Sequence, residues 1–156
     1  MASLRTFCEH KKEDFWLLGE VIHGDYFNWA NNERLHSTTN YECYKGLFSS
    51  HNDKNMFEIA FSLDREFNIE KGIYKDIYLY NFTDNHDVNR LARTVLEDYY
   101  LYTVNLLLFT VPGIPSVYYG SEWAVKWTKG GSDDWALRPN ISPDINNSNY
   151  NFDLEN

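Results

Sequence analysis

Acidic residues follow two apolar runs of the sequence, at positions where carboxylates could act as general acids or bases. Glu20 directly follows FWLLG, and Asp84 and Asp87 follow the run IYLYNF. A carboxylate at the end of a buried strand is costly to desolvate, so it needs either a partner or a function. Two such ends, with His86 adjacent to one of them, favour a candidate active site about as strongly as they favour solvated loop charges.

Short apolar runs predict the strands that would position these carboxylates. The predicted strands lie near residues 15–21, 35–43, 77–83 and 114–120. Strands that alternate with helices are typical of α/β architecture with a parallel sheet. Four strand–helix units make half of an eight-unit (β/α)₈ TIM barrel, so we expect a partial barrel. A half-barrel has two open sheet edges, which favour self-association.

Three helices are predicted between and around the strands. Residues 2–12 form the first, and a helix from about Asp98 to Phe109 is ended by Pro112-Gly113. The strongest helical pattern starts near Asn55, where apolar residues recur at helical spacing. These residues are Met56, Ile59, Ala60, Leu63 and Phe67. The stretch between residues 23 and 55 is polar, aromatic and aperiodic, and predicts a loop with one strand inside it.

Composition excludes several classes of partner. The net charge of −9 argues against nucleic acid and against anionic membrane surfaces, and 17% aromatic residues suit a carbohydrate site or a core. No apolar run approaches the ~20 residues that span a bilayer. Residues 1–14 contain no signal-peptide core, so we expect a cytoplasmic protein or a true N-terminus further upstream. Cys8 and Cys43 form no metal or redox motif and are expected to be free thiols.

Four blocks of the sequence resemble the α-amylase family of glycoside hydrolases. FWLLGEV is similar to the strand-five block, YNFTDNHDVNR to the strand-seven block, and VPGIPSVYYGSEW to the segment entering strand eight. NNERLHSTTNYECYKGLFSSHNDKN is similar to the strand-six region of neopullulanase-like and cyclomaltodextrinase-like members. The resemblance implies that residues 1–156 are the C-terminal half of the catalytic barrel, about strands five to eight.

The resemblance also implies a retaining reaction on α-glucosidic bonds of starch-like oligosaccharides such as maltodextrin, cyclodextrin or pullulan. By position, Glu20 would be the general acid/base, with an upshifted pKa. Asp87 would be the carboxylate that grips sugar hydroxyls and stabilises the transition state. His86 would hydrogen-bond hydroxyls of the sugar next to the cleaved bond.

Further substrate-binding candidates flank these positions. His23, Asp25 and Trp29 follow Glu20 and are candidates for the acceptor side of the cleft, while Arg90 would bind substrate, or position Asp87 or neighbouring loops. Tyr118 and Tyr119 are expected to pack in the barrel rather than to stack on sugar. No cofactor and no metal site are expected on this chain.

The family nucleophile is an aspartate in a Gly-x-Arg-x-Asp-like block, and the sequence contains no Arg-x-Asp. We therefore expect the chain to be catalytically incomplete alone, with the N-terminal half of the barrel or a second copy as partner. Three alternatives remain open. In the first, the chain is a non-catalytic sugar-binding half-barrel. In the second, it is a structural or self-associating half-barrel. In the third, it is part of a glycosyltransferase that uses the same intermediate.

Overall fold

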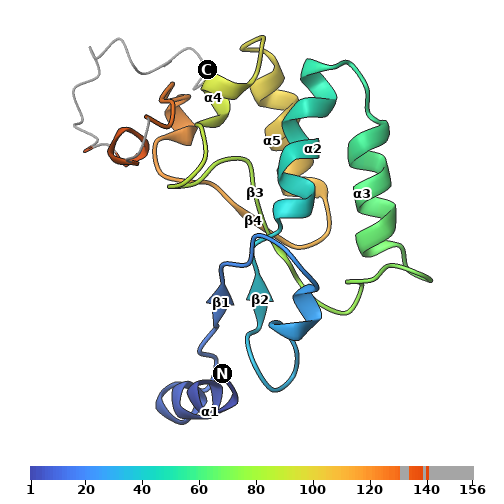
Figure 1. Cartoon of the computed structure of the whole chain (residues 1–156), viewed down its shortest axis with the longest axis vertical. Helices are drawn as coiled ribbons and strands as arrows, with labels where there is room; N and C mark the ends of the chain where they lie inside the picture. Colours follow the sequence, from blue (N-terminus) through green and yellow to red (C-terminus); the bar gives the residue numbers. More distant parts are fainter. Residues whose placement is uncertain (131–133, 139, 141–156) are drawn as a thin grey trace.

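The computed structural model describes residues 1–130, 134–138 and 140 (Figure 1). The α-helices are α1 (Ala2–Lys11), α2 (Tyr41–Asn52), α3 (Phe57–Phe67), α4 (Leu91–Thr94) and α5 (Tyr100–Thr110). The strands are β1 (Leu18–Gly19), β2 (Ser37–Thr38), β3 (Tyr80–Phe82) and β4 (Ile114–Ser116). Short 3-10 helices are η1 (Tyr26–Asn28), η2 (Ser121–Trp123) and η3 (Trp135–Leu137).

The four strands run parallel and follow one another in chain order. β1 pairs with β2, with Leu18 opposite Ser37, and β3 pairs with β4, with Tyr80 opposite Ile114. A parallel bridge between Thr39 and Tyr80 joins the two pairs. The carboxyl ends of all four strands therefore lie along one edge, as in a barrel wall.

Helices α2, α3 and α5 pack together beside the strands, and Figure 1 shows α2 between the other two. Their facing side chains form the main core with residues of α4 and of the segment after η2. The buried residues of this core are Cys43, Leu47, Ile59, Leu91, Ala92, Val95, Leu101, Val104, Leu108 and Ala124. The core thus holds the strands from the helical side and leaves their carboxyl ends accessible.

Helix α2 was missed by the sequence pattern, and the prediction of strand as far as residue 43 is wrong. The strand ends at Thr38, and the Asn40 side chain caps the helix by accepting from the backbone N–H of Cys43 at 3.1 Å. Buried Leu47 lies on the packed face of this helix. Polar residues interrupt the helical spacing of apolar residues over this stretch, so the helix-capping residue Asn40 was the stronger sequence signal.

The run FWLLGEV is not the fully buried strand that its composition predicts. Phe15, Trp16 and Leu18 are each about two-fifths exposed, and β1 itself covers two residues. Among the described residues only β2 pairs with β1, so one edge of the strand has no neighbour. The run FWLLGEV, whose apolar composition is typical of a fully buried strand, therefore lies at an unpaired edge of the sheet.

A buried polar network links α3 to the strand ends. The Glu66 carboxylate is fully buried, where it accepts from Asn40 Nδ2 at 2.8 Å and from Cys43 Sγ at 3.3 Å. Asn40 Nδ2 also donates to Asn81 Oδ1 at 2.9 Å, and Asn81 Nδ2 donates to the carbonyl of Pro112 at 2.8 Å. Burial raises the pKa of Glu66 to about 7, against the hydrogen bonds that favour its charged form.

We expect Glu66 to make the protein less stable as the pH rises from about 4.5 to about 7. In that interval the unfolded chain has released a proton that folded Glu66 still holds, so each rise in pH favours unfolding. The free energy of unfolding should fall by at most about 3 kcal/mol over this window. Urea unfolding of the parent and of Glu66→Gln across this range checks it. A difference between the two curves that does not change with pH would contradict the assignment.

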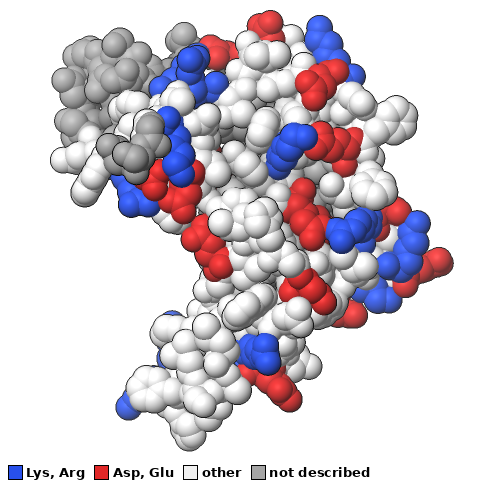
Figure 2. All heavy atoms as spheres, viewed as in Figure 1, with Lys and Arg blue, Asp and Glu red and all other residues white. Residues whose placement is uncertain are grey.

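Charged side chains of both signs are interspersed over the face shown in Figure 2. Most of the described basic residues visible there lie beside acidic ones, and they form no continuous basic patch, in line with the net charge of −9. Among the described residues, no helix is long and apolar enough to cross a membrane.

Candidate active site

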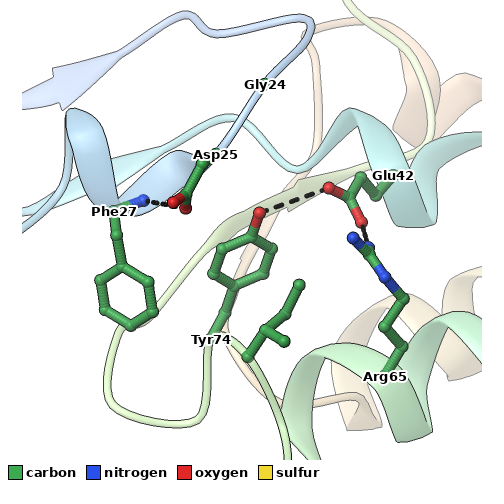
Figure 3. A pocket seen from close by; sticks show the side chains of 7 residues that line it. Gly24, Asp25, Phe27, Glu42, Arg65 and Tyr74 are labelled. Atoms are coloured by element: carbon green, nitrogen blue, oxygen red, sulfur yellow. Dashed lines mark hydrogen bonds and ion pairs between the residues drawn. The ribbon is translucent and has the colours of Figure 1, made fainter.

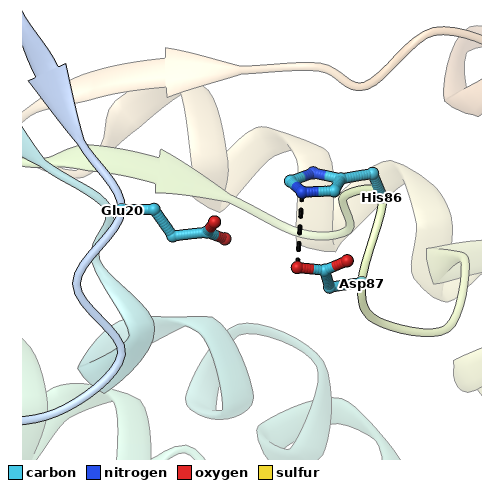
Figure 4. A group of neighbouring side chains, drawn as sticks. All are labelled: Glu20, His86 and Asp87. Atoms are coloured by element: carbon cyan, nitrogen blue, oxygen red, sulfur yellow. Dashed lines mark ion pairs between the residues drawn. The ribbon is translucent and has the colours of Figure 1, made fainter.

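The carboxyl ends of β1 and β3 bring three chemically active side chains together. Glu20 directly follows β1, and His86 and Asp87 lie on the loop after β3 (Figure 4). One carboxylate oxygen of Glu20, one carboxylate oxygen of Asp87 and one ring nitrogen of His86 all lie within 4.8 Å of one another. Parallel pairing through β2 places these strand ends on the same edge, so residues 66 positions apart along the chain meet in space.

Glu20 is exposed, and Tyr41 at the start of α2 holds it. The Tyr41 hydroxyl lies 3.0 Å from Glu20 Oε1 and is also 3.0 Å from Asn85 Nδ2. The other oxygen of Glu20 makes no hydrogen bond to a described residue. A carboxyl group with one oxygen held and one accessible can exchange a proton with a ligand.

Asp87 is half-buried and has a side-chain partner on each carboxylate oxygen. His86 Nε2 lies 3.3 Å from Oδ2, and Arg138 Nη2 lies 3.1 Å from Oδ1. Lys129 Nζ donates to the Asp87 backbone carbonyl at 3.2 Å. These contacts hold the Asp87 side chain in place beside Glu20.

A cleft of about 320 Å³ opens between the strand ends beside Glu20 and His86. Its lining combines aromatic rings with hydrogen-bonding groups. The lining residues are Leu18, Glu20, Thr39, Tyr80, Phe82, Asp84, Asn85, His86, Ser116 and Tyr118. Such a mixture suits a ligand that has apolar ring faces and many hydroxyls.

Arg90 is not brought to this cluster. Its side chain is fully buried, with Nε 3.5 Å from Asp84 Oδ2 and Nη2 donating to the carbonyl of Tyr119. The guanidinium lies 4.5 Å from the centre of the Tyr118 ring. Ser121 Oγ and the backbone N–H of Leu91 also donate to Asp84, at 2.7 Å and 2.9 Å. Arg90 therefore fastens the loops after β3 and β4, and Asp87 is paired with Arg138 instead.

Of the seven predicted site residues, Glu20 and His86 line this cleft, whereas Asp87, Arg90, His23, Asp25 and Trp29 do not. His23, Asp25 and Trp29 are exposed, and none of them lines the cleft beside Glu20. Asp25 accepts from the backbone N–H of Phe27 at 3.0 Å and so caps η1.

A second pocket, of about 600 Å³, lies on the side of Asp25 (Figure 3). Glu42 in its wall is ion-paired with Arg65 and accepts from Tyr74 Oη at 3.4 Å. The charged groups of Glu42 and Arg65 thus satisfy one another, and the pocket has no free carboxylate and histidine side by side.

Sequence reasoning did not single out Tyr41 or Arg138. Tyr41 follows the Asn40 helix cap, directly after a strand, and that position at the carboxyl edge of the sheet is a signal that could have identified it. Arg138 lies 51 residues beyond Asp87 and follows no recognisable pattern. Its contact with Asp87 depends on how the segment after η2 returns to the strand ends.

Glu20, His86 and Asp87 are also the described residues whose donor atoms are close enough to surround one cation. Tyr41 already binds one oxygen of Glu20, and His86 and Arg138 already bind both oxygens of Asp87. The Arg138 guanidinium beside Asp87 competes with a metal ion, so we interpret the cluster as a proton-transfer and hydrogen-bonding site.

Parallel strands in chain order, alternating with helices and carrying carboxylates at their carboxyl ends, define a part of an α/β-barrel enzyme domain. The chain belongs to the alpha-amylase family: the family described as "Alpha amylase, catalytic domain" matches residues 1–149. The family is one of TIM-barrel catalytic domains, and this chain is a fragment of such a domain, as the resemblance implied.

Individual relatives support the same family. A 4-alpha-glucanotransferase of Thermotoga neapolitana is 31% identical over 117 residues, which is 72% of this chain and 24% of the relative. The solved structure of an Anoxybacillus alpha-amylase is 28% identical with a TM-score of 0.66, over 86% of this chain and 31% of that one. A cyclomaltodextrinase structure has a TM-score of 0.77 at 20% identity, over 98% of this chain and 25% of that one, and shows the fold alone. The chain thus spans about a quarter of the curated relative's length.

Proposed function

We propose that this chain supplies the acid/base and a second catalytic carboxylate of a retaining enzyme that cleaves α-glucosidic bonds in starch-like oligosaccharides. The observation that carries the proposal is the meeting of Glu20 with His86 and Asp87, whose donor atoms lie within 4.8 Å of one another at the edge of the cleft. A carboxyl group with one accessible oxygen can protonate a leaving oxygen, and a second carboxyl group beside it can stabilise positive charge on the sugar.

In this proposal Glu20 protonates the glycosidic oxygen as the bond breaks, and then takes a proton from the incoming acceptor. Asp87 stabilises the positive charge that develops on the sugar ring, and His86 and Arg138 hold its two carboxylate oxygens in place. His86, half-buried at the cleft, hydrogen-bonds hydroxyls of the sugar whose bond is cleaved.

The relatives support an α-glucan as substrate, and two acceptors of the glycosyl group, water and a sugar hydroxyl, remain open. One relative is named as a 4-alpha-glucanotransferase, and one solved structure at 28% identity is named as an alpha-amylase. Water and a sugar hydroxyl enter at the same step, and Glu20 would deprotonate either. We propose maltodextrin-type oligosaccharides as the donors, because the cleft offers aromatic faces together with hydroxyl and amide groups.

The nucleophile is proposed to come from another polypeptide segment, since the sequence contains no Arg-x-Asp. The open edge of β1, with exposed Phe15, Trp16 and Leu18, is where a further parallel strand would join. The N-terminal half of a family barrel would bring both that strand and the nucleophile. A second copy of this chain would cover the edge without supplying the missing block.

Mixing experiments test this proposal. The pure chain should not hydrolyse a chromogenic maltooligosaccharide, whereas a mixture with the N-terminal half of a family barrel should do so, because only the mixture contains all three carboxylates. Size-exclusion chromatography of the same samples would show whether the halves associate. Turnover by the pure chain would contradict the proposed incompleteness. Oligosaccharide binding without turnover in a complex shown to be folded would favour the sugar-binding alternative.

A further inference from the structure

Tyr41 links the two halves of the candidate site. It is the first residue of α2 and is separated from the carboxyl end of β2 by Thr39 and Asn40, and β2 lies between the strands that precede Glu20 and Asp87. Its hydroxyl is 3.0 Å from Glu20 Oε1 and 3.0 Å from Asn85 Nδ2. A single hydroxyl thus contacts the strand-end acid and the loop that bears Asp87.

The direction of these hydrogen bonds follows from the backbone. Asn85 Oδ1 accepts from the N–H groups of Asp87 at 2.8 Å and of Val88 at 3.1 Å. The amide nitrogen of Asn85 must therefore face Tyr41, where it can only donate. Because the tyrosine oxygen accepts that bond, its own proton is free to point at Glu20, whose carboxylate can only accept.

The ring of Tyr41 is fixed by its surroundings. It packs edge-on against Phe82 of β3 at 4.9 Å and against Tyr44 at 6.1 Å. The Tyr41 backbone N–H donates to the hydroxyl of buried Tyr26 at 3.1 Å. Burial raises the pKa of Tyr41 to about 12, so the hydroxyl keeps its proton over the range in which enzymes work.

We propose that Tyr41 is a positioning residue for Glu20. Its hydroxyl donates a hydrogen bond to Glu20 Oε1 and, through Asn85, fixes the position of that oxygen relative to the loop of residues 85–88. This inference rests on the proposed function of Glu20. With Oε1 occupied, Oε2 is the oxygen that gives and takes the catalytic proton. The distance between Glu20 and Asp87 therefore depends on the position of the Tyr41 hydroxyl, which is hydrogen-bonded to Glu20 and, through Asn85, to the backbone of Asp87.

Tyr41→Phe in the complemented enzyme tests the proposal, because it keeps the ring and its packing and removes only the hydroxyl. We expect kcat to fall about ten- to a hundredfold, as expected for a hydrogen bond to a charged group, with KM changed little. The alkaline limb of the pH–rate profile should move to higher pH, because a carboxylate that loses a donor binds its proton more tightly.

Tyr44→Phe is the matched control. Tyr44 lies on the same helix and stacks on Phe82 at 5.1 Å, and its hydroxyl donates no hydrogen bond to a described residue. Its removal should leave kcat and the pH profile as they are. Equal activity and equal pH profiles for Tyr41→Phe and the parent would overturn the proposal.

Carboxyl-carbon NMR titration of Glu20 separates this inference from the proposed function. In this chain alone, Tyr41→Phe should move the Glu20 titration to higher pH, and Tyr44→Phe should not. If no mixture is active but the titration moves, the proposed function fails and the hydrogen bond stands. If the mixture is active through Glu20 but neither titration nor kcat responds to Tyr41→Phe, only the positioning proposal fails.

Discussion

Glu20→Gln is expected to lower kcat/KM of the complemented enzyme toward maltooligosaccharides about a hundred- to ten-thousandfold. Glutamine keeps the shape of the side chain and an oxygen for the Tyr41 hydroxyl, which lies 3.0 Å from Oε1. It cannot transfer a proton, so both the departure of the leaving sugar and the activation of water lose their catalyst. Steady-state rates on maltotriose-length and longer substrates give the measurement.

The leaving group and the acceptor provide the controls for this variant. An aryl glycoside with an acidic phenol needs little protonation, so the loss of rate should be smaller for its first step. Azide needs no general base, and it should restore turnover of that substrate in Glu20→Ala. A uniform loss of rate for all substrates, with no rescue, would indicate a structural role for Glu20 and contradict the assignment.

Asp84→Asn is expected to lower the free energy of unfolding by about 3–5 kcal/mol. The change leaves the fully buried guanidinium of Arg90 without its counter-ion, and an arginine cannot lose its charge. Arg90→Met should cost less, because burial raises the pKa of Asp84 and the remaining acid can be neutralised by taking up a proton. Urea unfolding at pH 7 compares the two variants.

The exposed ion pair between Lys126 and Asp98, at 2.7 Å, is a matched control. Both side chains are roughly half exposed, so Asp98→Asn should change stability by at most about 1 kcal/mol. Equal effects of Asp84→Asn and Asp98→Asn would mean that the buried pair does not hold the loops after β3 and β4 together.

Elements with a clear period or a clear stop could be predicted from the sequence. Helix α3 follows its apolar spacing, and α5 ends just before Pro112. The approach of Glu20 to His86 and Asp87 was also predictable, because parallel strands place their carboxyl ends together.

Contacts that depend on tertiary packing could not be predicted. Of the roles expected for Arg90, the positioning of neighbouring loops agrees with its burial against Asp84, and a contact with Asp87 does not, since nothing in NHDVNR indicates which acid it would meet. Arg138 reaches Asp87 from a distant part of the chain. His23 and Trp29 follow Glu20 closely in sequence, but the chain turns away from the cleft after β1.

The strands pair in the order in which they occur along the chain, and no pairing within the described residues joins the first strand to the last. Each pairing therefore closes only the loop between one strand and the next, which limits the entropy lost at every step. On the ribosome, β1 and β2 are complete before β3 has been translated, so the strands can pair one at a time in the direction of synthesis.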